Sequence, residues 1–238
     1  EPNIIKVQET RIDVGFESKI VVISDLHIGE YVKTSFLDRV VKKINEIDNV
    51  DAVIIAGDIT YYPRKDLSSL LYPLKDLKYP TYAVLGNHDS EHPGPPIADE
   101  LMEILTEYGI EILNNNTSAI KNRSIDIVGF GDLWAKEDDT EILKNYSNED
   151  FLIAIAHNPD TVYSYGNILP DLTISGHTHG GQIRVPLIYK FFIPSEYGFN
   201  QGIYSTNFGK VFVSSGLGLT GLPFRFGIPP VIDVLSLD

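Results

Sequence analysis

Five short polar motifs contain five of the chain's six histidines and the side chains best suited to chemistry. They are Asp25-Leu26-His27, Gly57-Asp58, Gly86-Asn87-His88-Asp89, His157-Asn158 and Gly176-His177-Thr178-His179. Imidazole, carboxylate and amide ligands suit Mn²⁺, Fe or Zn²⁺. Two such ions beside two ligand carboxylates keep a positive charge that attracts an anionic phosphate ester. Two ions about 3.5–4 Å apart can also hold a bridging hydroxide for in-line attack on phosphorus.

The motifs stand at the ends of apolar runs that have the length of strands. The runs are Ile20–Ser24, Ala52–Ala56, Thr81–Leu85, Ser124–Gly129, Phe151–Ala156 and Leu172–Ser175. In open α/β sheets the carboxyl ends of the strands face one crevice, so we expect the motifs to converge in space. Each motif alone is compatible with an ordinary loop, but their repeated position after strands favours a metal site.

Helical patterns lie between several of these runs, which predicts an α/β fold. The clearest helix is predicted to follow Thr34 or Ser35 as its N-cap and to place an apolar face toward the sheet. Further helices are predicted over Pro96–Tyr108 and Lys136–Asn145. Because no linker is evident, residues 1–238 are interpreted as one domain.

Composition excludes several functional classes. The 238 residues carry a formal charge of −14, which disfavours tracking along nucleic acid, and the absence of cysteine excludes disulfides and thiolate metal sites. The sequence contains no run of 18 apolar residues, the length that predicts a membrane-spanning helix. The chain begins at Glu1-Pro2 without methionine, so we expect the natural protein to extend upstream.

The last quarter of the chain differs from the rest in composition and charge. Residues 180–238 contain ten aromatic residues and carry a net charge of +1, against −15 for residues 1–179. Their prolines and short apolar runs predict irregular β structure and long loops that complete the sheet. We expect this basic, aromatic region to line the substrate entrance, although internal packing is the alternative.

The ordered motif set resembles the calcineurin-like metallophosphoesterase superfamily over residues 18–238. The resemblance implies a four-layer sandwich of two mixed β-sheets flanked by helices, with the metal site at the strand carboxyl ends. It implies that one metal ion takes Asp25, His27, Asp58 and His179. A second ion takes Asp58, Asn87, His157 and His177, so Asp58 bridges. It also implies that His88 protonates the leaving oxygen and that Asp89 orients the His88 ring.

The longer segment Gly176-His177-Thr178-His179-Gly180-Gly181-Gln182 is similar to one branch of that superfamily. Members of that branch are often membrane-linked phosphodiesterases, and relatives cleave the pyrophosphate of UDP-diacylglucosamine. The similarity implies membrane-associated or extracytoplasmic location, with a cytoplasmic protein as the alternative. Gly180 and Gly181 are expected to allow close backbone approach to the metals or the substrate.

Two aromatic segments of the last quarter, Tyr189–Ile193 and Leu222–Phe226, are predicted to form a rim that faces lipid or substrate. Within the second segment, Arg225 is expected to pair with a phosphate oxygen. Phe191, Phe192, Phe224 or Phe226 would meet the leaving group. Packing within the core and loops is the alternative reading.

The sequence therefore predicts a hydrolase with two divalent metal ions that acts on phosphodiester or pyrophosphate bonds. The substrate is expected to be a phosphate ester linked to lipid or nucleotide, and peripheral membrane contact is expected. A phosphomonoesterase or nucleotide phosphatase is the alternative enzyme. A noncatalytic scaffold of the same fold is the alternative outside enzymes, but such a scaffold would be expected to lose ligands or His88. The sequence leaves the metal, the natural ester and the oligomeric state open.

Overall fold

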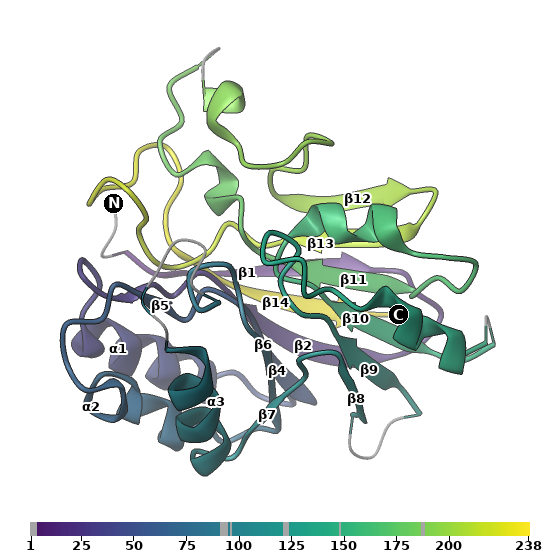
Figure 1. Cartoon of the computed structure of the whole chain (residues 1–238), viewed down its shortest axis with the longest axis horizontal. Helices are drawn as coiled ribbons and strands as arrows, with labels where there is room; N and C mark the ends of the chain where they lie inside the picture. Colours follow the sequence, from purple (N-terminus) through teal and green to yellow (C-terminus); the bar gives the residue numbers. More distant parts are fainter. Residues whose placement is uncertain (1–3, 91–94, 96, 121–123, 148, 187–188) are drawn as a thin grey trace.

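Two six-stranded mixed sheets pack face to face in the computed structural model, which describes residues 4–90, 95, 97–120, 124–147, 149–186 and 189–238. The first sheet has the order β1 (Lys6–Ile12), β14 (Val231–Leu237), β2 (Ser18–Ile23), β4 (Ala52–Ala56), β6 (Thr81–Val84) and β7 (Ile110–Ile112). All neighbours in it are parallel except β14 and β2, which pair antiparallel. Figure 1 shows this sheet crossing the molecule behind the second one.

The second sheet has the order β12 (Gly202–Thr206), β13 (Gly209–Val213), β11 (Leu172–Ser175), β10 (Leu152–Ile155), β9 (Asp126–Gly129) and β8 (Asn116–Ala119). Its four central strands are parallel, and the two edge strands β12 and β8 run antiparallel to their neighbours. The last quarter of the chain thus completes both sheets, as the sequence suggested. A separate small bridge joins β3 (Ile28–Gly29) to β5 (Thr60–Tyr61).

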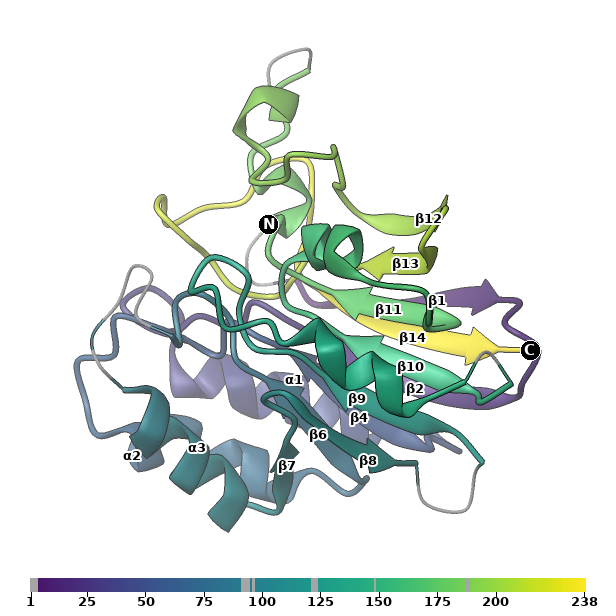
Figure 2. The same cartoon turned by 45° about the vertical axis from the view of Figure 1, so that its right-hand side comes forward.

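The central strands are apolar on both faces because both faces are covered. In β4, Ile54 points into the core between the sheets, while Val53 and Ile55 point toward the helices. The helical layer consists of α1 (Thr34–Asn45), α2 (Leu67–Leu71) and α3 (Ala98–Glu107), on the side of the first sheet away from the second (Figure 2). This confirms an α/β sandwich of mixed sheets flanked by helices.

The outer face of the second sheet is covered differently from the prediction. The helix expected over Lys136–Asn145 is instead a short 3₁₀ helix, η2 (Thr140–Asn145), and a second one, η3 (Pro159–Ser164), lies beside it in the same layer. Leu143 of η2 and Val162 of η3 are buried against the sheet. A few anchoring side chains suffice there, so the helical pattern in the sequence did not require a full α-helix.

Candidate metal centre

The loop after β2 carries Asp25 and His27 on a backbone that is held by the loop after β4. The Asp25 amide donates to the Gly57 carbonyl and the His27 amide donates to the Asp58 carbonyl, each at 3.0 Å. Asp25 and His27 have φ values of 49° and 48°, a conformation that is costly outside glycine. The bonds between the two loops maintain this conformation, and they bring His27 Nε2 to 4.0 Å from Asp25 Oδ1.

Asp58 follows β4 and is bound by the loop after β6. The His88 amide donates to Asp58 Oδ1 at 2.9 Å. Gly86 passes so close that a Cβ atom there would lie 2.2 Å from the same oxygen. Only glycine fits at this position, and its small size allows the two loops to meet. The other oxygen, Asp58 Oδ2, faces the imidazoles of the cluster.

The second sheet supplies three histidines from the ends of β10 and β11. His157 Nδ1 lies 2.8 Å from the Ala56 carbonyl, to which it donates, so Nε2 is the nitrogen that faces the cluster. A Cβ atom at Gly57 would lie 2.5 Å from His157 Nδ1. His177 and His179, which follow β11, have φ values of 70° and 51°. Residues at the carboxyl ends of strands from both sheets therefore contact one another at the site.

A first group of donors consists of Asp25, His27, Asp58 and His179, all buried, whose ligand atoms lie within 4.8 Å of one another. His27 Nε2 lies 3.0 Å from His179 Nε2 and 3.4 Å from Asp58 Oδ2. His179 Nε2 lies 3.3 Å from Asp25 Oδ1. A tetrahedral ion with bonds of about 2.1 Å separates its ligands by about 3.4 Å, so these spacings fit one cation.

A second group of donors surrounds the other side of Asp58. His157 Nε2 lies 3.3 Å from Asp58 Oδ2 and 3.3 Å from His177 Nδ1. His177 Nδ1 lies 3.0 Å from Asn87 Oδ1. The same carboxylate oxygen of Asp58 thus touches both groups. All seven side chains that were predicted as ligands therefore lie close together in the structure.

Burial sets the protonation of these groups. Burial raises the pKa of Asp25 to about 6 and lowers the pKa values of His27 and His177 to about 3 each, because the charged forms lose water. Burial also acts to lower the pKa of His157, but the Asp58 carboxylate outweighs it and raises that pKa to about 10. His157 in turn holds the pKa of Asp58 well below its usual value, against the effect of burial.

The donor set fits divalent metal ions. Neutral imidazole and ionised carboxylate are the forms that bind such ions. His27 and His177 are neutral at physiological pH, whereas His157, with a pKa of about 10, would release its Nε2 proton when an ion binds. Nitrogen and oxygen donors without sulfur suit Mn²⁺, Fe and Zn²⁺ alike. The two ring nitrogens that face each other at 3.0 Å in the first group, from His27 and His179, are natural neighbours when both bind one cation.

His88 stands outside both donor groups. Its half-buried ring lines the pocket over the cluster and makes edge contacts with the rings of His27, at 5.1 Å between centroids, and Tyr61, at 4.9 Å. A ring in this position can exchange a proton with a bound molecule without being a ligand.

Asp89 was expected to orient the His88 ring, but its carboxylate binds backbone. Its oxygens accept hydrogen bonds from the amides of Ile59 and Thr60, each at 2.9 Å, from the Thr60 hydroxyl at 2.9 Å, and from the Gly86 amide at 3.2 Å. These bonds tie the loop after β4 to the loop after β6. Asp89 therefore fixes the backbone that presents Asp58 and His88.

Arg225 differs from its expected place on the entrance rim. Its side chain is only 3% exposed, Nε donates to the Gly218 carbonyl at 2.9 Å, and one terminal nitrogen donates to the Ser215 carbonyl at 3.0 Å. The other terminal nitrogen lies 3.4 Å from His179 Nδ1. The loop curls around the guanidinium, which is consistent with the alternative of internal packing.

Gly180 differs from expectation, since the side chain it makes room for lies away from the donor groups, whereas Gly181 lines the pocket over the donor groups. A Cβ atom at Gly180 would lie 2.2 Å from Ile228, and one at Gly181 would lie 3.0 Å from Tyr189. Gly57, Gly86, Gly176 and Gly216 are the glycines whose backbone borders donor side chains. The sixth histidine, His92, and the chain start at Glu1-Pro2 lie outside the described residues.

Two residues near the site were missed by the sequence analysis. Asp132 follows β9 at the same edge of the sheet and is 1% exposed, and Trp134 lines the pocket with its ring 4.4 Å from that of His177. Gly131-Asp132 repeats the pattern of a polar residue after a buried strand, which could have identified Asp132. Trp134, the chain's single tryptophan, sits in a loop without a recognisable signal.

Among the helices of the described residues, none is both long and apolar enough to cross a lipid bilayer.

Comparison with known proteins identifies relatives over most of the chain. A family model described as calcineurin-like phosphoesterase matches residues 18–181. An uncharacterized metallophosphoesterase of Bacillus subtilis is 32% identical over 100% of this chain and 87% of its own length. The phosphodiesterase YaeI of Escherichia coli is 32% identical over 92% of this chain and 82% of its own length. The chain spans only 64% of a similar Campylobacter jejuni protein, also an uncharacterized metallophosphoesterase.

Two further similarities are more distant. The UDP-2,3-diacylglucosamine pyrophosphatase LpxG of Chlamydia muridarum is 27% identical over 78% of this chain and 72% of its own length. The crystal structure of a phosphopantetheinyl hydrolase from Mycobacterium tuberculosis has the same fold, with a TM-score of 0.52 and 12% identity over 85% of this chain and 91% of that one.

Proposed function

Because the chain belongs to the calcineurin-like phosphoesterase family, we propose that it is a metal-dependent hydrolase of phosphodiester or pyrophosphate bonds. The observation that carries this proposal is the meeting of seven donor side chains, of which Asp58, Asn87, His177 and His179 line one pocket together with His88. The names of two relatives, a phosphodiesterase and a pyrophosphatase, support this reaction class.

We propose two metal positions that share Asp58. The first is held by Asp25, His27, Asp58 and His179, and the second by Asp58, Asn87, His157 and His177. Bound ions would supply Lewis acidity and lower the pKa of a water molecule. The chain's own part is to hold these donors rigidly, which the locked loops and the left-handed backbone at five of them accomplish.

His88 is proposed as the general acid. Its ring lines the pocket above the donors, and its backbone amide is anchored to Asp58 Oδ1, so ring and phosphate would keep a fixed relation. From there a ring nitrogen can donate a proton to the oxygen that leaves phosphorus. Asp89 acts indirectly, because its carboxylate accepts from the amides of Thr60 and Gly86 and so positions the two loops that carry Asp58 and His88.

A diester is favoured over a monoester by the shape of the pocket. The pocket has a volume of about 550 Å³, more than a phosphate group fills, and it extends from Trp134 on one side to Leu222 on the other. Substituents on phosphorus therefore have space to lie along the cleft. The membrane-associated or extracytoplasmic location remains part of this proposal, and the diacyl substrate in the name of the Chlamydia relative supports it.

The test is a comparison of turnover of bis-p-nitrophenyl phosphate and p-nitrophenyl phosphate with Mn²⁺, Fe²⁺ or Zn²⁺, together with metal analysis. The proposal expects faster diester hydrolysis that is abolished by chelation and by Asn87→Ala. Lys42→Ala, on the exposed face of α1, is the matched control. Faster monoester hydrolysis would favour the phosphatase alternative, and metal binding without any hydrolysis would favour a scaffold.

A further inference from the structure

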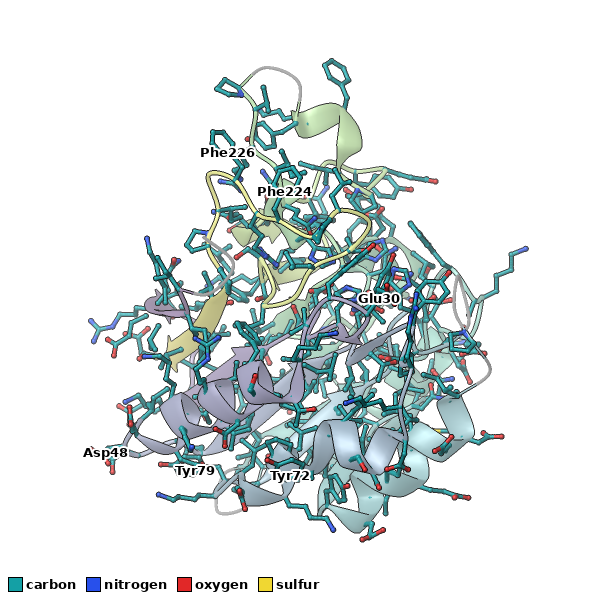
Figure 3. The ribbon with its side chains drawn as sticks, turned by 90° about the vertical axis from the view of Figure 1, so that its left-hand side faces the viewer. Glu30, Asp48, Tyr72, Tyr79, Phe224 and Phe226 are labelled. Carbon is teal, nitrogen blue, oxygen red and sulfur yellow. The ribbon has the colours of Figure 1, made fainter. Side chains whose placement is uncertain are left out.

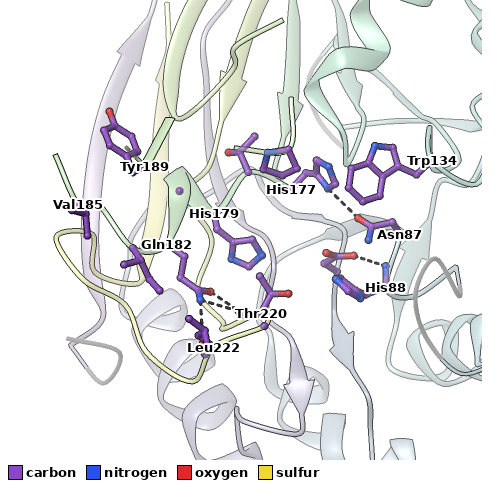
Figure 4. Close-up of a pocket in the computed structure, with 16 residues that line it drawn as sticks. Asn87, His88, Trp134, His177, His179, Gln182, Val185, Tyr189, Thr220 and Leu222 are labelled. Carbon is purple, nitrogen blue, oxygen red and sulfur yellow. Dashed lines mark hydrogen bonds between the residues drawn. The ribbon is translucent and has the colours of Figure 1, made fainter. Parts of the chain in front are cut away.

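The pocket over the donor groups continues onto a surface that takes no part in metal binding. This surface, called the apolar wall below, consists of Ile183, Val185, Tyr189 and Leu222, and it lines the same pocket as Asp58, His88 and His177. Figure 4 shows Val185, Tyr189 and Leu222 on one side, Asn87, His88 and Trp134 on the other, and His179 between them. A phosphate at the donors would thus have the apolar wall within reach of one substituent.

The apolar wall is fixed to the loop that carries His179. The Gln182 side-chain amide donates to the carbonyls of Thr220 at 2.8 Å and Leu222 at 3.1 Å, and its oxygen accepts from the Thr220 amide at 2.9 Å. The backbone of Gln182 also accepts from the amide of Phe226 at 3.0 Å. These bonds hold Leu222 at a set position relative to the donors, so the wall is a built part of the pocket.

The chemistry of the wall determines what it can bind. Val185 is 41% exposed and Leu222 is 52% exposed, so both hold apolar surface in water at the pocket mouth. Covering such surface with an apolar group is favourable. The segments 182–186 and 215–230 contain Arg184 and Arg225 but no acidic residue, in a chain whose formal charge is −14. Nothing in these segments repels an anionic ester with an apolar tail.

We propose, building on the proposed function, that the apolar wall binds an alkyl or acyl substituent of an amphiphilic phosphate ester whose phosphate lies at the donor groups. The substituent passes between Leu222 and Val185, and the phosphate stays over His177 and His88. Trp134 closes the opposite side of the pocket, with its ring at 89° to that of His177. A nucleobase stacked on Trp134 or Tyr189 is the competing occupant, which the experiment distinguishes.

The experiment uses the metal-loaded enzyme and alkyl p-nitrophenyl phosphate diesters with methyl, butyl and octyl groups. All three lose the same p-nitrophenolate, so only the non-reacting substituent changes. We expect KM to fall with chain length, by up to about fourfold for each methylene that becomes buried, while kcat stays nearly constant. Equal KM values across the series would overturn the proposal.

Leu222→Ser is the diagnostic variant because the Leu222 side chain is 52% exposed and lines the pocket, and the Tm of the variant should match that of the unmodified chain. It should flatten the dependence on chain length, raising KM for the octyl diester far more than KM for the methyl diester. Phe191→Ser is the matched control, since Phe191 is 84% exposed and does not line the pocket. An unchanged chain-length dependence in Leu222→Ser would place the substituent elsewhere and contradict the proposal.

A binding measurement separates this proposal from the proposed function. Trp134 is the only tryptophan, so its fluorescence reports on the pocket when octylphosphonate, methylphosphonate or uridine monophosphate is added. We expect a blue shift with octylphosphonate at concentrations where methylphosphonate gives none, and loss of that shift in Leu222→Ser. Tighter binding of the nucleotide would refute the alkyl assignment. A protein that binds octylphosphonate but cleaves no diester would refute the hydrolase and keep the apolar site.

Discussion

The donor groups and the apolar wall border one pocket but are built in opposite ways. Each donor lies within a few residues of a buried strand, and its loop is fixed by backbone bonds and close glycines. The apolar wall comes from loops that stand away from the sheets, with half-exposed side chains. In Figure 3, Phe224 and Phe226 of this loop region lie at the far end of the molecule from Tyr72 and Tyr79. Reactive groups thus stand on the rigid scaffold, and recognition is left to loops.

The largest effect is expected from Asp58→Asn, which removes the carboxylate that both donor groups share. The neutral amide cannot offset the charge of two ions, so we expect loss of both ions and a fall in activity of more than about a hundredfold. Metal analysis and diester kinetics measure the two effects. Asp38→Asn, which replaces a partly exposed carboxylate on α1 outside the donor groups, is the control. Full activity with both ions retained would show that the donor side is not organised around Asp58.

His88→Ala tests whether chemistry and metal binding separate within the donor side. Because His88 lies outside both groups, we expect the metal content to stay unchanged while kcat falls by about 10²–10⁴-fold. The loss should shrink for esters with acidic leaving groups, which need little protonation. Inductively coupled plasma analysis and a series of aryl esters provide the measurement. An equal loss across the series would argue against the acid role.

The difference between the two regions also explains what the sequence could predict. Near-continuous apolar runs such as Ala52–Ala56 mark buried parallel strands, and the carboxyl ends of such strands converge, so Asp58 and its partners could be identified. Arg225 could not be placed, because its burial depends on how the loop closes around the carbonyls of Ser215 and Gly218. Local sequence does not encode that closure. The pairing of β14 with both β1 and β2 depends likewise on contacts between the two ends of the chain.

Arg225→Met tests whether the buried Arg225 side chain stabilises the loop next to the donor groups. Its removal leaves two buried carbonyls without donors, at a cost of about 1–3 kcal/mol each. We expect Tm to fall by about 4–24 °C and activity toward large and small diesters to decline alike. Thermal melts with two-substrate kinetics measure this, and Arg11→Met, at an exposed ion pair, is the control. A stable variant with a raised KM for the large diester alone would indicate that Arg225 contacts the substrate at the pocket entrance.

The smallest effect is expected at Asp233, where β14 of the first sheet contacts Ser214, the residue that follows β13 of the second sheet. The Ser214 hydroxyl donates to Asp233 Oδ2 at 2.7 Å, and burial raises the pKa of Asp233 from 3.8 to about 6. The folded chain therefore binds this proton more tightly than the unfolded chain does. The resulting stabilisation is complete below about pH 4 and is lost as the pH rises to about 6.

Asp233→Asn removes this titration while its amide oxygen can still accept from Ser214. We expect the variant to gain about 2–3 kcal/mol relative to the unmodified chain between about pH 4 and pH 7. Urea unfolding in the presence of a chelator measures the difference without a contribution from bound metal. Asp38→Asn should show no comparable change, because that carboxylate is on the surface of α1. A pH-independent difference would mean that Asp233 is ionised in the folded chain, and that the two sheets are joined there by a charged hydrogen bond.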